Sequence, residues 1–415
     1  MTIKKSELTV SSLGKLLIVA CAASLGVTGC STPDRLPAVP SASALRTAEG
    51  LGPIRFLVAR ETDSFAAEAR SALAKEQAWL ASTGTTGEMP PAYFLAISGG
   101  GDNGAFGSGV LNGWTAAGTR PEFKVVTGVS TGALIAPFAF MGAKYDYVVK
   151  KVYTTTAQKE IFKKRGLAGI LFGDSMADTR PLATLIQSYV TREFLDEIAA
   201  EYARGRILLV GTANLDSLEP VIWNMTAIAA SQDPRAIRLF RQILLASASI
   251  PGAFPPVMID VNLDGTAYQE MHVDGGTMSQ VFLYPPSIGV AKAAPRKRVL
   301  YIIRNARLDA DWASTQRRTM SIAMRAIDAL TTTQGIGDLY RIYATAERDG
   351  LDFNLAYIPP TFTTPHGEMF DTAYMQSLYE VGFQAAKAGY TWQKYPPGFM
   401  APVDAAPAGT KTSSP

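Results

Sequence analysis

The sequence predicts an α/β fold in which helices cover a mainly parallel β-sheet. Two consecutive strand-turn-helix units lead to this prediction. Apolar residues 93–97 precede a glycine-rich turn and a helical pattern at residues 105–117, and apolar residues 123–127 precede a serine turn and a helical pattern at residues 131–141. Consecutive βα units favour parallel strands with helices packed on the sheet.

Further elements follow the same apolar periodicities. We expect strands at residues 206–214, 221–225, 272–273, 298–304 and 353–358. We expect helices at residues 62–82, 236–249, 318–332, 336–348 and 373–388. Residues 160–180 mix helical sequence with a Gly/Asp loop, in which Leu171 and Phe172 suggest an apolar lid. The simplest division is an N-terminal helix and loop at 61–90, one α/β domain at 91–400 and a disordered tail at 401–415.

Composition bounds the class of protein. The 415 residues are 47% hydrophobic and 18% charged, enough for a sizeable core. A net charge of +3 without a Lys/Arg run does not favour nucleic-acid binding. Acidic residues are not unusually common, so we expect neither a multi-carboxylate metal site nor another cofactor.

The N-terminus resembles an export signal. Lysines precede the apolar residues 16–27, which are too few to span a bilayer comfortably, and Val27-Thr28-Gly29-Cys30 resembles a bacterial lipobox. This resemblance implies a signal peptide at residues 1–29, a lipidated Cys30 with a linker over residues 30–60, and a membrane anchor. Because Ser31 rather than Asp follows Cys30, the pattern favours the outer membrane. The alternative is ordinary export with an incidental cysteine.

The serine turn has the features of a nucleophile elbow. Gly128 and Gly132 flank Ser130 at two residues on either side, which relieves crowding in a sharp strand-to-helix turn. The helix that follows directs its N-terminal dipole toward developing negative charge. The alternative is a tight turn in which Ser130 only caps the helix.

The glycine-rich turn can supply an oxyanion hole. Consecutive glycines leave N–H groups unshielded beside a helix N-terminus. The candidate residues are Gly99, Gly100, Gly101, Asn103 and Gly104. A dinucleotide site would need an acidic residue after the second strand, where the serine turn lies instead. A packing role for the glycines is the remaining alternative.

Candidates for the base that activates Ser130 lie in two places. Val273 separates His272 from Asp274, so a strand would place both side chains on one face. Asp274 precedes Gly275 and Gly276 and could also be a turn residue. The order Ser130, Asp274, His366 fits the α/β-hydrolase triad, which keeps a Ser-Asp-His mechanism open.

The ordered motifs together resemble the patatin-like phospholipases. The matching blocks, which fall within residues 92–305, are Gly99/Gly101/Gly104, Gly128/Ser130/Gly132, residues 246–256 and Asp274-Gly275-Gly276. The resemblance implies a three-layer α/β/α sandwich with a mainly parallel sheet and a Ser130–Asp274 dyad. It implies a serine acyl hydrolase acting on membrane lipid or another lipid ester, of the phospholipase A, lysophospholipase or general esterase type.

Two features qualify this resemblance. Asn103 stands where the family often has Arg or Lys, and Thr277 follows the glycines where the family tends to have a hydrophobic residue.

A carboxylate is a weak base, so the dyad requires an environment that raises the pKa of Asp274. A non-catalytic envelope lipoprotein that retains the fold is the alternative from a different class.

Overall fold

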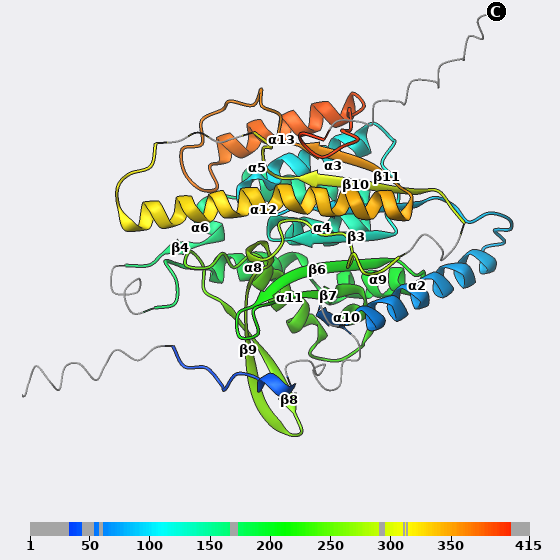
Figure 1. The fold of residues 1–415 in the computed structure, drawn as a ribbon, viewed down its shortest axis with the longest axis horizontal. Coiled ribbons are helices and arrows are strands. Elements are labelled where there is room, and N and C mark those ends of the chain that lie inside the picture. The colour runs from blue at the N-terminus through cyan, green and yellow to red at the C-terminus, as the bar shows by residue number, and fades with distance from the viewer. Residues whose placement is uncertain are drawn as a thin grey trace, which may run out of the picture.

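A nine-stranded sheet forms the centre of the computed structural model (Figure 1). The structure describes residues 33–43, 54–57, 61–166, 173–289, 295–309, 312 and 314–399. Along the main path the strand order is β1-β7-β6-β3-β2-β10-β11, while β9 pairs with both β6 and β8. The expected signal peptide, Cys30, the Leu171/Phe172 lid and the tail at 401–415 lie outside the described residues.

Five neighbouring strands are parallel, which confirms the mainly parallel sheet. They are β6 (Ile207–Asn214), β3 (Val125–Val129), β2 (Ala92–Ile97), β10 (Arg298–Arg304) and β11 (Leu351–Tyr357). Along β2, Leu95 and Ile97 enter one apolar cluster, whereas Phe94 and Ala96 enter the other. Strand residues alternate between faces, so the sheet is buried on both sides, as parallel sheets are.

Helices supply the two outer layers. One face carries α3 (Gly104–Ala116), α4 (Thr131–Met141), α11 (Ala236–Ser247) and α13 (Thr372–Lys387). The other face is covered by α12 (Thr319–Asp349) and residues 281–288, with α2 (Thr62–Ser82) against its edge. The remaining helices are α5 (Asp146–Thr155), α6 (Gln158–Ile161), α8 (Arg180–Tyr189), α9 (Arg192–Ala203) and α10 (Met225–Ala230). The fold is therefore an α/β/α sandwich.

The sheet ends in antiparallel strands on the β6 side. These are β7 (Glu219–Asn224), β1 (Arg55–Leu57), β8 (Val257–Leu263) and β9 (Thr266–Asp274). The strand expected at 272–273 is only the end of β9, which forms a long hairpin with β8 extending away from the sheet in Figure 1. Asp264 and Gly265 turn this hairpin with φ of 51° and 82°. Asp-Gly is a common sequence for such a turn.

The prediction of separate helices at 318–332 and 336–348 was wrong. They form one helix, α12, which runs without a break through Gly335. A Cβ at Gly335 would lie 2.2 Å from Nη1 of Arg304, so this glycine allows a close approach of the arginine rather than ending the helix.

Small residues bring α3 and α13 into backbone contact. A Cβ at Gly113 would lie 2.1 Å from the carbonyl oxygen of Phe383, and one at Gly109 would lie 2.1 Å from that of Tyr379. Asn112 donates a hydrogen bond of 3.0 Å to the Tyr379 hydroxyl across the same contact. Since α3 begins at the glycine-rich turn, this packing fixes the position of that turn.

We therefore predict opposite effects for two helical glycines. Gly113→Ala lowers the free energy of unfolding by about 1–3 kcal/mol, because its methyl group overpacks the contact. Gly337→Ala, where nothing lies within 4 Å of the added Cβ, leaves it unchanged or raises it by up to about 1 kcal/mol. Urea denaturation measures both values. Equal stability of the two variants would contradict the close packing of α3 on α13.

Candidate active site

Ser130 lies on a sharp turn between β3 and α4. Its backbone has φ 55° and ψ −126°, a conformation that non-glycine residues rarely adopt. A Cβ at Gly128 would lie 2.4 Å from the Gly132 carbonyl oxygen, and one at Gly132 would lie 2.2 Å from that of Ile97. Both positions therefore require glycine, and the turn presents Ser130 at the carboxyl end of the parallel strands.

Asp274 meets Ser130 from the far end of β9. The Ser130 hydroxyl donates a 2.6 Å hydrogen bond to Oδ2 of Asp274, whose Oδ1 accepts a 2.7 Å bond from the Gly276 N–H. The antiparallel pairing of Asp274 with Thr212 on β6 brings the carboxylate to the serine. A Cβ at Gly275 would lie 2.5 Å from the Gly211 carbonyl oxygen, so this glycine allows the chain to turn tightly against β6.

Burial changes the acidity of Asp274. The residue is only 5% exposed, and loss of solvation raises the pKa of its carboxyl to about 7 from an ordinary value of 3.8. The hydrogen bonds from Ser130 and Gly276 act in the opposite direction, because they favour the charged form. A carboxyl with a pKa near 7 accepts a proton from a hydroxyl more readily than an ordinary carboxylate does.

The end of α11 and the segment that follows it hold both members of this pair. The Ser130 N–H donates to Oγ of Ser247 at 3.0 Å, and the Ser247 hydroxyl donates to the Gly211 carbonyl oxygen at 2.7 Å. The Asp274 N–H donates to the Ser249 carbonyl oxygen at 2.9 Å. Ser247 and Ser249 are thus positioning residues. The sequence block at 246–256 contributes to the family resemblance, but it does not predict the separate contacts of these two serines with the dyad residues.

The glycine-rich turn offers fewer free donors than expected. The N–H groups of Gly99, Asn103 and Gly104 donate to the carbonyl oxygens of Gln280, Gly100 and Gly101, respectively. The Asn103 side chain accepts a 2.7 Å hydrogen bond from the Tyr374 hydroxyl. Of the turn's described N–H groups, those without an acceptor belong to Gly100, Gly101 and Asp102.

Glycine is required at the tightest point of this turn. The backbone of Gly100 has φ 153°, and a Cβ there would lie 2.1 Å from the Asn305 carbonyl oxygen. Gly99 is adjacent to the serine, since its added Cβ would lie 3.2 Å from Cβ of Ser130. The turn that carries the free N–H groups is therefore tightly packed and lies beside Ser130.

His366 contacts the glycine turn rather than the Ser130–Asp274 pair. Its Nε2 lies 2.7 Å from Oδ2 of Asp102, and its ring packs on Tyr374 with centroids 4.4 Å apart. Asp102 also accepts a 2.7 Å hydrogen bond from the Phe370 N–H. The Ser130–Asp274–His366 order in the sequence therefore does not correspond to a hydrogen-bonded triad.

His272 belongs to a separate buried network. Its Nδ1 lies 2.9 Å from the Thr212 hydroxyl, and its Nε2 lies 3.1 Å from Oε2 of Glu270. Arg55 completes the network by a 2.5 Å ion pair with Glu270. Burial lowers the pKa of His272, although the neighbouring Glu270 carboxylate partly opposes this shift.

An apolar pocket opens at Ser130 and extends into the helical layer. Gly101 and Thr131 line it beside Ser130. Its walls come from α4, α5, α8, α11 and the segment after α11, and include Leu134, Phe138, Val149, Ile186, Leu244 and Phe254. Among the described residues, no charged side chain lines this pocket, so its polarity fits a hydrocarbon chain.

The described residues contain no cluster of three or more His, Cys, Asp or Glu side chains that could hold a metal ion. Within the same part of the chain, every helix is too short or too polar to cross a membrane.

A serine on a strand-to-helix turn, bonded to a buried carboxylate beside a glycine-rich loop, is typical of α/β serine hydrolases. Residues 95–285 match the family model described as patatin-like phospholipase, so the chain contains a patatin-like phospholipase domain. This domain supports lipid hydrolysis as the broad class of activity.

Several solved structures are similar to this chain at low sequence identity. VipD from Legionella pneumophila is 12% identical, with a TM-score of 0.37 over 74% of this chain and 68% of VipD. The type III effector ExoU of Pseudomonas aeruginosa is 13% identical, with a TM-score of 0.29 over 72% of this chain and 54% of ExoU. Human GIVD cytosolic phospholipase A2 is 11% identical, with a TM-score of 0.30 over 74% and 52%, respectively. The chain thus spans about half the length of the latter two proteins. A search of curated proteins finds no match.

The buried carboxyl leads to a prediction about stability. The folded-state pKa of Asp274 exceeds its ordinary value, so its stabilising protonation is complete at low pH and is lost as the pH rises through about 7. Asp274→Asn lacks this titration. Its free energy of unfolding should therefore rise relative to wild type by about 2–3 kcal/mol between pH 5 and pH 9. Urea denaturation across this range tests the prediction, and a difference independent of pH would contradict it.

Proposed function

We propose that this protein hydrolyses carboxylic esters of lipids through a Ser130–Asp274 dyad. The observation that carries the proposal is the 2.6 Å hydrogen bond from the Ser130 hydroxyl to the buried Asp274 carboxylate. Its position at the entrance of an apolar pocket supports a substrate with an acyl chain. The patatin-like domain supports the same substrate class.

The first half of the reaction forms an acyl-enzyme. Asp274 accepts the Ser130 proton while Oγ attacks the ester carbonyl carbon, which gives a tetrahedral oxyanion. Collapse of this intermediate breaks the bond to the alcohol, which leaves with the proton from Asp274. In the second half, Asp274 takes a proton from water while the water oxygen attacks the acyl carbonyl carbon. Collapse of the second tetrahedral intermediate breaks the bond to Oγ, Asp274 returns the proton to Oγ of Ser130, and the fatty acid is released.

The free N–H groups of Gly100 and Gly101 are the proposed oxyanion donors. Preorganised donors contribute most where water is excluded and no reorganisation is needed. Gly100 packs closely against Asn305, and α3 packs closely against α13. These contacts hold the turn in place, so the donors need no reorganisation. Asp102 adds a third free N–H to the same turn.

The pocket binds the acyl chain in this proposal, while the alcohol portion lies outside it. The lining formed by the described residues is uncharged, which suits a hydrocarbon and offers no cationic side chain to a phosphate group. Asn103 also lacks the cationic side chain that the family often has at its position. Phospholipids and neutral lipid esters therefore both fit the proposal, which covers phospholipase A, lysophospholipase and general esterase activities.

A lipid anchor at Cys30 would place this site at its substrate. We propose export as a lipoprotein, on the basis of the lipobox-like sequence. Arg35 forms two 2.8 Å hydrogen bonds with Asp216, just beyond the carboxyl end of β6. Five extended residues span at most about 18 Å, so an anchor at Cys30 would be tethered near the edge of the sheet that bears Ser130.

The activity test follows fatty acid release from phospholipid vesicles and from a soluble short-chain ester. We expect Ser130→Ala and Asp274→Asn each to reduce kcat/KM at least about 1,000-fold. The wild-type kcat/KM should rise with pH and level off above about 7, since Asp274 must be ionised to accept the proton. Normal turnover by Ser130→Ala would overturn the proposed function.

Replacement of His366 distinguishes the dyad from a triad. We expect His366→Ala to retain kcat/KM on the soluble ester within about threefold, because its ring contacts Asp102 and not the reacting pair. Circular dichroism and thermal unfolding serve as controls for the fold. A loss as large as that of Asp274→Asn, in a folded variant, would favour the Ser-Asp-His mechanism instead.

A further inference from the structure

The first half of α12 contributes no described side chain to the core. Among the described side chains from residue 319 to 334, none is buried, whereas Leu339, Ile342 and Ala346 of the second half belong to the core. The helix therefore has an anchored half and a free half. We define the free half as residues 319–334.

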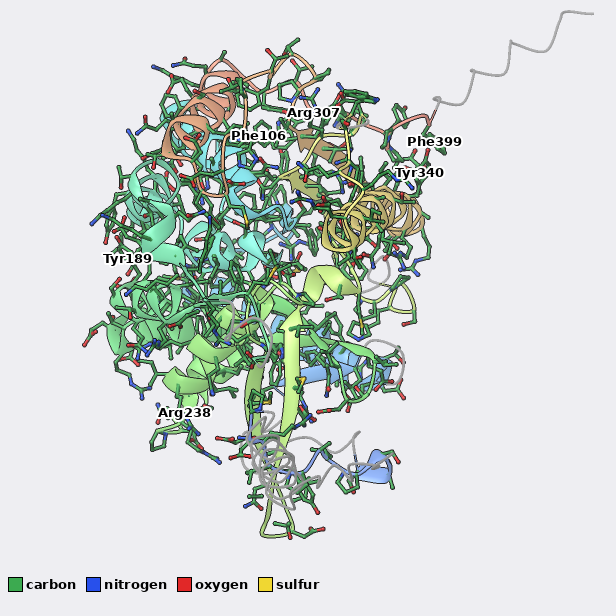
Figure 2. All side chains as sticks on the ribbon, turned by 90° about the vertical axis from the view of Figure 1, so that its left-hand side faces the viewer. Phe106, Tyr189, Arg238, Arg307, Tyr340 and Phe399 are labelled. Carbon is green, nitrogen blue, oxygen red and sulfur yellow. The ribbon has the colours of Figure 1, made fainter. Side chains whose placement is uncertain are left out.

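This free half extends past the edge of the sheet that carries the active site. Arg304, the last residue of β10, approaches the Thr332 carbonyl oxygen at 3.5 Å, which places Thr332 level with that edge. Thr319 and Thr332 are thirteen positions apart, which corresponds to a rise of about 20 Å at 1.5 Å per residue. In Figure 1 the yellow end of α12 projects at the left, and Figure 2 views the helix nearly end-on from that side.

Three large apolar side chains are exposed on the free half. Ile322, Ile327 and Leu330 are 54%, 41% and 70% exposed, while the polar residues Ser321 and Arg325 are half-buried. An ordinary surface helix has the opposite arrangement, with its apolar face toward the core. Trp312, shortly before the helix, is 88% exposed. Clustered exposed apolar side chains of this kind indicate a binding surface.

Basic residues adjoin these apolar side chains. Arg317 and Arg318 are exposed directly before the helix, and residues 317–334 contain three arginines and one aspartate. Apolar side chains beside arginines are typical of helices that lie in the interface of an anionic membrane. A charged protein partner would account for the arginines but not for the exposed isoleucines and leucine.

We propose that the free half of α12 binds the surface of a bilayer that contains anionic phospholipids. Ile322, Ile327 and Leu330 enter the acyl boundary, while Arg317 and Arg318 contact the headgroups. Because this helix and Ser130 lie at the same edge of the sheet, binding turns the active-site edge toward the bilayer. The role of this orientation in lipid hydrolysis rests on the proposed function, but binding to the bilayer can be measured without any hydrolysis.

Tryptophan fluorescence tests whether the free half of α12 inserts into the bilayer. The full chain is added to vesicles of phosphatidylglycerol and brominated phosphatidylcholine. Bromine quenches tryptophan only within the bilayer, so the readout reports which surface is inserted even if the N-terminus also binds. Ile327→Trp should add tryptophan emission that the brominated lipid quenches by at least about half, relative to unbrominated vesicles. The matched control is Tyr147→Trp at a 61% exposed position beyond the far end of α4. Equal quenching in the two variants overturns the proposal.

A second experiment separates membrane binding from catalysis. We expect Ile327→Asp combined with Leu330→Asp to lower hydrolysis of anionic vesicles at least about tenfold and to leave soluble-ester hydrolysis within about twofold. Tyr147→Asp should change neither rate, and Arg317→Glu with Arg318→Glu should reduce the vesicle rate most at low salt. Equal loss on both substrates overturns the proposal.

Two other results also decide the matter. If the wild-type chain hydrolyses neither substrate, the proposed function fails, while the quenching experiment still tests membrane binding. If Ile327→Asp with Leu330→Asp converts a dimer into a monomer in sedimentation, and brominated lipid does not quench Ile327→Trp, a second copy of the chain covers this face and the proposal is overturned.

Discussion

The hydrogen bond between Ser130 and Asp274 imposes the strongest constraint on this structure. It joins the end of a parallel strand to the end of an antiparallel hairpin strand, 144 residues apart in the sequence. The bond requires a serine in an unfavourable backbone conformation and a carboxylate that is buried away from solvent, and each of these costs free energy. The glycines at 128, 132 and 275 allow the close backbone contacts that hold this arrangement.

The layers of the sandwich divide the remaining tasks. The parallel strands hold Ser130 and the glycine-rich turn at one edge, and β6 aligns Asp274 through antiparallel pairing. The helical layer on one face both buries the sheet and leaves the apolar pocket beside Ser130. On the opposite face, the second half of α12 covers the sheet while its first half remains available for another surface. Core formation and substrate access thus depend on the same helices.

Local sequence patterns were sufficient to predict the parallel strands and the serine turn. The apolar runs and flanking glycines contain the information for a βα unit, and the contacts of Gly128 and Gly132 agree with that interpretation. Recognition of Asp274 depended on the ordered family motifs, because no local pattern indicates which strand end meets Ser130. The raised pKa of Asp274 likewise depends on burial by distant segments.

The features that were missed depend on tertiary contacts. The Gly99 N–H donates to the carbonyl oxygen of Gln280, which is distant in the sequence, and the Asn103 N–H donates to Gly100 within the turn. The glycine spacing shows neither bond, so it predicted too many free donors. The two helices predicted at 318–332 and 336–348 are one helix, in which Gly335 accommodates Arg304. The length of β9 was underestimated because most of it pairs with β8 beyond the sheet, where alternating polar residues weaken the apolar signal.

Covalent labelling tests the central claim most directly. The wild-type protein and Asp274→Asn are treated with a fluorophosphonate at pH 8 in detergent, and intact-mass analysis with peptide mapping follows the reaction over time. Activation of Ser130 by Asp274 predicts a single adduct on Ser130 in the wild type and much slower labelling of the variant. Equal labelling rates, or no adduct on Ser130 in the folded wild-type protein, would contradict the dyad.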